Sequence, residues 1–188
     1  MTAETVNNKT LKTRDLTLIA LFAALIAICA WITVPMPDVP FTMQVFGIFM
    51  ALLLLGGRRG TWSILLYLLL GAVGLPVFSG FRGGMGALLS VTGGYLIGFA
   101  FSGLVYWAIT AAVKKDSLIV QVCSLLAALF VCYAFGTLWF VLVYLRGGST
   151  VSVGFVLMKC VVPYLIPDFA KLALSVTIAK TVKKHAKR

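Results

Sequence analysis

The chain has 188 residues, of which 61% are hydrophobic and 11% are charged, and its mean hydropathy is +1.06. Soluble domains are about 45–50% apolar and about 25% charged, so this composition excludes a soluble globular protein and predicts an all-α integral membrane protein. The net charge of +11 does not indicate a nucleic-acid partner, because the basic residues stand between and after the apolar stretches. The length favours one membrane domain, residues 1–188.

Six apolar spans follow one another along the chain. We place them at about residues 16–34, 44–55, 61–73, 92–113, 118–145 and 151–180. A full crossing takes about 20 residues, so the short second and third spans are expected to be tilted, kinked or partly re-entrant. Residues 56–60 form a turn between these two spans. The proline-rich segment 35–43 and the glycine-rich segment 74–86 are predicted to be irregular.

The basic residues test this count. With the N-terminus inside, only Arg82 and Arg146 face outward, and both termini are cytoplasmic. The positive-inside rule therefore supports six transmembrane helices in one bundle. Twelve basic residues then lie on the cytoplasmic side: Lys9, Lys12, Arg14, Arg58, Arg59, Lys114, Lys115, Lys180, Lys183, Lys184, Lys187 and Arg188. In this orientation the two irregular segments face outward and suggest a pocket that opens to the outside.

Asp168 and Lys171 stand inside the sixth span. Charges at membrane depth are costly and usually face a bundle interior, and helical residues three apart share a face. Counting up from Lys180, Asp168 lies about 18 Å into a hydrocarbon core about 30 Å thick. We predict that this pair lines a ligand site. The alternative is a self-compensating ion pair that only closes the bundle.

Other polar residues in the spans have a structural and a functional interpretation. Thr42 and Gln44 are candidate ligand contacts, although Thr42 equally fits a helix cap. Lys159 fits either a ligand contact or a side chain that snorkels to the lipid headgroups. Tyr95 is expected in the pocket, whereas Gly94 and Gly98 also fit close helix packing. The first span carries four alanines that suit either a partner helix or internal packing: Ala20, Ala23, Ala24 and Ala27.

Several kinds of site are not expected. Neither the four cysteines (Cys29, Cys123, Cys132 and Cys160) nor the single His185 has the spacing of a metal site or a disulfide framework, so we interpret the cysteines as packing residues and predict no metal and no cofactor. There is no phosphate-binding loop and no His-Glu-x-x-His motif. A small binding bundle of this kind needs a partner to supply energy for transport.

Several motifs together resemble the BioY family, the biotin-specific substrate-binding (S) components of energy-coupling factor (ECF) transporters. The motifs span nearly the whole chain: Val39-Pro-Phe-Thr-Met-Gln44, Gly74-Leu-Pro-Val-Phe78, Gly83-Gly84, Thr92-Gly-Gly-Tyr-Leu-Ile-Gly-Phe99 and Pro167-Asp-Phe-Ala-Lys171. The chain departs from the family pattern at Ser90-Val91, where Gly-Pro is usual.

The resemblance implies a six-helix S-component fold in a bacterial plasma membrane. It also implies a transmembrane coupling protein and two ATPase subunits as partners, and a docking role for the alanines of the first span. In the implied site, Asp168 accepts from the ureido N–H groups of biotin. Lys171 donates to the ureido carbonyl or holds Asp168 ionised. Further expected contacts are apolar walls from Tyr95, Phe41 and Phe78, and donors to the biotin carboxylate from Arg82 or the backbone of Gly83 and Gly84.

Two other functions compete with this hypothesis. One is an intramembrane enzyme that uses Asp168 as a base, which requires a second catalytic group at a matching depth. The other is a scaffold bundle that binds no small ligand. We favour a vitamin-binding transport subunit that is not itself an enzyme.

Overall fold

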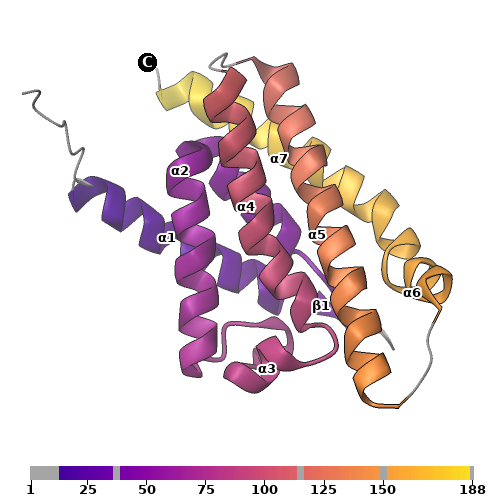
Figure 1. The fold of residues 1–188 in the computed structure, drawn as a ribbon. Helices are drawn as coiled ribbons and strands as arrows, with labels where there is room; N and C mark the ends of the chain where they lie inside the picture. The colour runs from indigo at the N-terminus through magenta and orange to yellow at the C-terminus, as the bar shows by residue number, and fades with distance from the viewer. Residues whose placement is uncertain (1–12, 36–38, 114–116, 149–151, 187–188) are drawn as a thin grey trace, which may run out of the picture.

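A computed structural model describes residues 13–35, 39–113, 117–148 and 152–186, and their structure is almost entirely helical (Figure 1). The elements in chain order are α1 (Thr13–Trp31), β1 (Thr33–Val34), β2 (Phe41–Thr42), α2 (Gln44–Val73), a 3₁₀ helix (Ser79–Phe81), α3 (Met85–Leu89), α4 (Gly93–Val113), α5 (Leu118–Arg146), α6 (Val153–Cys160) and α7 (Val162–Ala186). Among the described residues, five helices are long and apolar enough to cross a membrane: α1, α2, α4, α5 and α7.

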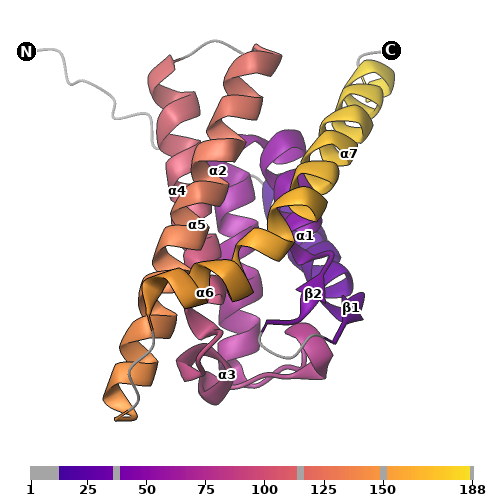
Figure 2. The same cartoon turned by 90° about the vertical axis from the view of Figure 1, so that its right-hand side faces the viewer.

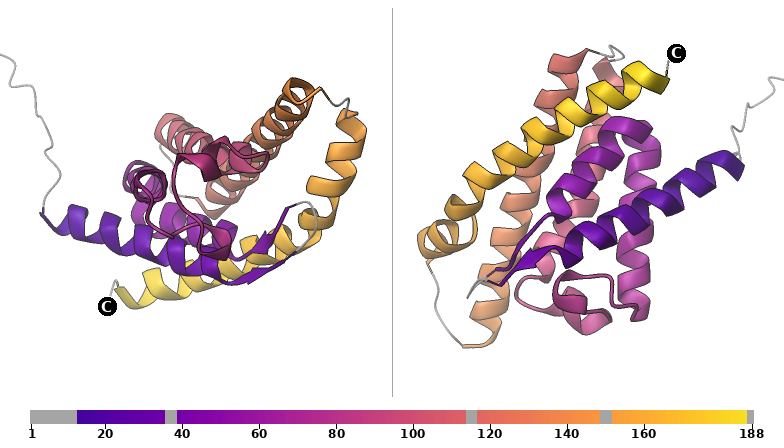
Figure 3. Two further views of the ribbon diagram at one scale, coloured as in Figure 1. Left: turned by 90° about the horizontal axis from the view of Figure 1, so that it is seen from below. Right: turned by 180° about the vertical axis from the view of Figure 1, so that it is seen from behind.

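The helix α2 is a hairpin of two helical segments. Gly56, at φ 79° and ψ 171°, interrupts the helical backbone between them. Nε2 of Gln44, near the start of α2, donates to Oη of Tyr67 at 2.9 Å, which a straight helix would place far away. Figure 3 shows the two segments side by side. The turn predicted over residues 56–60 is therefore confined to Gly56, and residues 57–60 are already helical.

The sixth predicted span is divided into two helices. Val161, at φ −121° and ψ −56°, separates α6 from α7, and Figure 2 shows α6 bent away from the line of α7. Pro163 is the second residue of α7, a position in the first turn where proline is tolerated. Pro167 lies inside α7 and leaves the carbonyl of Pro163 without its helical donor. The span predicted over residues 151–180 is therefore made of two helices that meet at Val161.

Basic residues gather at one end of the bundle, which we call the basic end. The end of α7, the Gly56 turn, the end of α4 and the start of α5 meet there, at the top of Figure 1. An ion pair of 3.1 Å between Arg59 and Asp15 brings the start of α1 to the same end. The irregular segment with α3 and the end of α5 lie at the other end. The described basic residues at the basic end are Arg14, Arg58, Arg59, Lys180, Lys183 and Lys184.

Small residues bring the helices close together. A Cβ atom at Gly98 would lie 3.1 Å from Sγ of Cys132 on α5, and one at Gly94 would lie 2.2 Å from Cβ of Trp139 on the same helix. Both glycines therefore serve the packing of α4 on α5, the structural one of the two interpretations. Gly47 packs in the same way against Cys29 of α1.

Candidate ligand-binding site

A cavity opens between the start of α2, the start of α4, the middle of α5 and the upstream part of α7. Its space is about 790 Å³, including the open mouth. Small-molecule pockets are mostly apolar, with a few polar groups that fix the ligand. The apolar wall comes from five elements or links: Val39 and Pro40, Val45, Phe78, Leu96 and Phe99, and Leu129.

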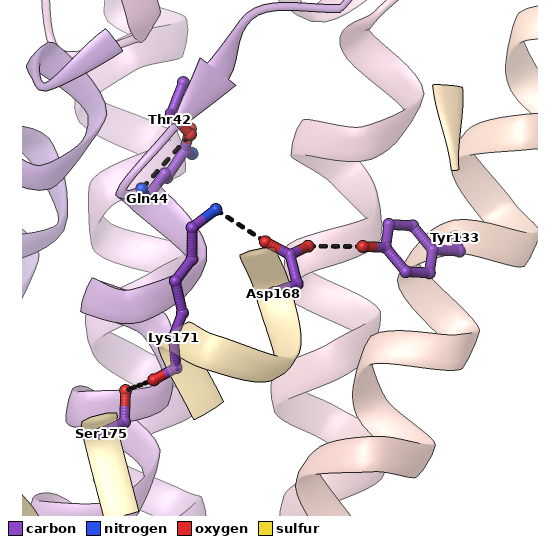
Figure 4. A network of polar contacts seen from close by, with 6 residues as sticks. All are labelled: Thr42, Gln44, Tyr133, Asp168, Lys171 and Ser175. Atoms are coloured by element: carbon purple, nitrogen blue, oxygen red, sulfur yellow. Dashed lines mark hydrogen bonds and ion pairs between the residues drawn. The ribbon is translucent and has the colours of Figure 1, made fainter. Parts of the chain in front are cut away.

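Asp168 and Lys171 are two of the charged residues that line the cavity. Nζ of Lys171 donates to Oδ1 of Asp168 at 2.6 Å, and the two residues are 5% and 3% exposed. Their spacing of three places both side chains on the same face of α7. Oη of Tyr133 on α5 donates to Oδ2 of Asp168 at 2.5 Å, so the carboxylate lies between two donors (Figure 4).

This arrangement leaves hydrogen-bonding capacity for a ligand. A carboxylate has about four lone-pair sites and an ammonium has three donors. Lys171 and Tyr133 occupy one site on each oxygen of Asp168, and Asp168 takes one donor of Lys171. Nζ of Lys171 also lies 4.1 Å from the ring centroid of Phe41. A donor and acceptors are thus presented together at the wall of an apolar cavity.

The segment before α2 covers one side of the cavity. β1 and β2 pair antiparallel, Thr33 with Thr42. The N-cap position of α2 is Met43 and not Thr42, although the Thr42 hydroxyl accepts from N–H of Gln44 at 3.3 Å. Thr42 and Gln44 also line the cavity. The hydroxyl of Tyr164 on α7 donates to the carbonyl of Val39 and so ties this segment to α7.

The glycine-rich segment, residues 74–86, forms a second side of the cavity. N–H of Phe78 donates to the carbonyl of Arg82 at 2.9 Å, and this tight turn directs the buried Phe78 inward. Phe78 packs edge-on against Tyr67, with ring centroids 5.5 Å apart. Arg82 also lines the cavity, with Nε donating to the carbonyl of Ser79 at 3.1 Å. Of the described residues that line the cavity, the charged ones are Arg82, Lys171 and Asp168, a surplus of one positive charge.

Four of the predicted contacts lie outside the cavity lining. The Phe41 ring faces Lys171 instead. Gly83 packs against the carbonyl of Leu75, and Gly84 N–H donates to the carbonyl of Gly71 at 2.7 Å, so that N–H is already engaged. Lys159 is exposed on α6, with Nζ 6.0 Å from the Phe155 ring. This position suits the snorkelling interpretation.

The BioY family model matches residues 4–188, nearly the whole chain. The chain belongs to the BioY family. This confirms the resemblance inferred from the motifs.

Individual relatives of this BioY-family chain agree. It is 40% identical over 173 residues to the "Biotin transporter BioY" of Thermotoga maritima, covering 91% of this chain and 96% of that protein. It is 36% identical over 173 residues to the "Probable biotin transporter BioY" of Pyrococcus horikoshii, covering 92% and 98%. Its fold matches the 2.1 Å crystal structure of the S-component for biotin from an ECF-type ABC transporter, with a TM-score of 0.80, 27% identity and coverage of 97% and 95%.

In this BioY-family chain the alanines of α1 lie on two faces. Ala23 and Ala27 are buried, at 1% and 6% exposure, against the remaining core. Ala20 and Ala24 are exposed. Internal packing therefore accounts for the first pair, and only the second pair is free to meet a partner helix.

Sequence reasoning missed several cavity residues of this family member. Tyr133, Tyr164, Cys132 and Cys160 all line the cavity. Cys132 and Cys160 were interpreted only as packing residues. A signal for Tyr133 existed, because a tyrosine hydroxyl in the middle of an apolar span needs a partner. Sequence alone did not say that the partner is Asp168.

Proposed function

We propose that this chain is a biotin-binding S component, which captures the vitamin from outside and delivers it with an ATP-driven ECF module. The observation that carries the proposal is the Asp168–Lys171 pair at the wall of an apolar cavity, in a chain whose relatives are named biotin transporters. Those names describe a family of transporters rather than enzymes, which disfavours an intramembrane enzyme that uses Asp168.

Biotin suits the chemistry of the cavity. In its cyclic urea each N–H stands beside the carbonyl oxygen, so one edge of the ring presents a donor and an acceptor together. Asp168 accepts from that N–H, and a free donor of Lys171 reaches the carbonyl. The apolar wall with Phe78 and Tyr95 packs on the thiophane ring and the alkyl chain. Arg82 is the candidate for the biotin carboxylate, because the N–H of Gly84 is engaged within the protein.

We further propose a single membrane domain of six crossings. The two antiparallel segments of α2 count as two crossings, and α1, α4, α5 and α7 supply the other four. The basic end then faces the cytoplasm by the positive-inside rule, with both termini, and the cavity opens outward. Crossing segments of 44–55 and 57–73 are short, so they are tilted or do not reach both surfaces.

The proposed partners are a transmembrane coupling protein and two ATPase subunits in a bacterial plasma membrane. The exposed Ala20 and Ala24 of α1 are proposed to meet the coupling protein, because small residues four apart allow close approach of a helix. This surface is separate from the cavity, so docking and biotin binding can be tested independently.

The test is biotin binding by the purified protein, measured by calorimetry and by mass spectrometry of gently purified material. Wild-type protein is expected to bind, and Asp168→Asn and Lys171→Ala are each expected to lose about tenfold or more, because hydrogen bonds to charged groups contribute about 1.5–3 kcal/mol. Lys180→Ala, an exposed lysine of the same helix, is the matched control. Near-normal affinity in both site variants would reject the pocket assignment. Wild-type protein that ignores biotin would favour a scaffold bundle.

A further inference from the structure

Tyr133 holds the carboxylate of Asp168 from a different helix. Its hydroxyl donates to Oδ2 at 2.5 Å, while Lys171 donates to Oδ1 at 2.6 Å. With one donor on each oxygen, the carboxylate plane is fixed rather than free to rotate about χ2. Figure 4 shows Asp168 between the two donors. Lys171 lies on the same helix as Asp168, so of the two donors only Tyr133 fixes the carboxylate relative to a helix other than α7.

The packing of the helices shows why a contact between Tyr133 and Asp168 is needed to fix α7 relative to α5. α5 packs mainly on α4, whereas α7 packs mainly on α2. Helices α5 and α7 contact each other through side-chain hydrogen bonds. Tyr133 donates to Asp168 at the cavity, and Nζ of Lys183 donates to Oε1 of Gln121 at 3.5 Å near the basic end. Close backbone packing does not fix the position of Asp168 relative to the α4–α5 wall, which carries Tyr95 and Leu96.

We infer that Tyr133 is a positioning residue that sets biotin affinity through Asp168. The inference deepens the proposed function and rests on it. The Tyr133 hydroxyl takes one site on Oδ2 and leaves the remaining acceptor sites of Asp168 in one orientation toward the ligand N–H. A preorganised acceptor binds more tightly than one that must be ordered on binding.

Tyr133→Phe tests the inference because it keeps the ring and removes only the hydroxyl. The expected result is a dissociation constant for biotin that is about threefold to tenfold higher, because the carboxylate of Asp168 must then be ordered on binding. Tyr144→Phe is the matched control, because Tyr144 is an exposed tyrosine of the same helix and lies outside the cavity lining. Its affinity is expected to stay within about twofold of wild type, since a surface substitution changes little.

A ligand series separates positioning from a general structural role. Desthiobiotin keeps the urea and lacks the sulfur ring, so Tyr133→Phe is expected to weaken it by the same factor as biotin. An analogue methylated on the ureido nitrogens cannot donate to Asp168, and the factor for that analogue is expected to approach one. Equal factors for all three ligands, or biotin affinity within about twofold of wild type, would overturn the inference. Failure of the wild type to bind biotin would instead overturn the proposed function itself.

Discussion

Gln44 and Tyr67 are 23 positions apart in the chain, yet their side chains form a buried hydrogen bond of 2.9 Å. The bond closes the α2 hairpin at the end away from Gly56. Because Gln44 also lines the cavity, the fold of the hairpin and the shape of the site depend on the same contact.

Removing one charge of the buried Asp168–Lys171 ion pair should lower the unfolding free energy more than removing both charges. Lys171→Met leaves Asp168 charged and buried, and the ligand-free protein is expected to lose about 3–5 kcal/mol of unfolding free energy. The double variant Asp168→Asn with Lys171→Met should recover much of that loss and still fail to bind biotin. Unfolding in detergent, followed by circular dichroism, checks both. A single variant as stable as wild type would contradict the prediction.

Gly71 is required by the ring of Phe78. A Cβ atom at Gly71 would lie 2.0 Å from Cζ of Phe78, so Gly71→Ala must displace a cavity wall. Overpacking of this kind costs about 1–3 kcal/mol, and biotin affinity should fall as well. Gly86→Ala is the control, because a Cβ atom there meets nothing within 4 Å. Thermal unfolding and calorimetry are the measurements, and identical behaviour of the two variants would refute the assignment.

The two alanine faces of α1 should give different phenotypes. Ala20→Leu and Ala24→Leu change an exposed face, so purified protein should still bind biotin while uptake by cells that contain the coupling module falls. Ala23→Leu overfills the core and should lower the unfolding temperature instead. Ala108→Leu, an exposed alanine of α4, is the control for uptake. Loss of biotin binding in Ala24→Leu would show that the face is not separate from the site.

Gly56 should be sensitive to any side chain for backbone reasons alone. Its φ of 79° with ψ of 171° is a region that is essentially restricted to glycine, while a Cβ atom there meets nothing within 4 Å. Gly56→Ala is therefore expected to cost about 1–3 kcal/mol of unfolding free energy. Equilibrium unfolding measures this loss, with Gly86→Ala as the control. Unchanged stability would mean that the hairpin reverses by another conformation.

The apolar spans could be read from the sequence because membrane helices need long uninterrupted apolar runs. Their interruptions were harder to place. The Gly56–Gly60 run looked like a five-residue turn, although one glycine with positive φ suffices to reverse the helix. The prolines at 163 and 167 indicate a kink in the last span, but the break itself lies at Val161, within an apolar run where the composition changes little. The number of crossings and their orientation remain predictions from charge.

Asp168 and Lys171 could be selected as site candidates because a charged side chain raises the free energy of a helix in a membrane. Tyr133 could be recognised only as a hydroxyl that needs a partner, because the sequence does not show that the partner on another helix is Asp168. The backbone of Gly84 illustrates the opposite error. The sequence predicts that this N–H could bind the biotin carboxylate, but in the folded segment it donates to the carbonyl of Gly71.

The surplus positive charge of the cavity lining has a consequence for the loaded protein. Arg82 and Lys171 outnumber Asp168 by one, and biotin carries one carboxylate. Without a ligand the described lining is therefore cationic, and a bound carboxylate would bring its net charge to zero. A cleft lined by an excess of one charge attracts the opposite one, so the lining favours an anionic ligand over a neutral one.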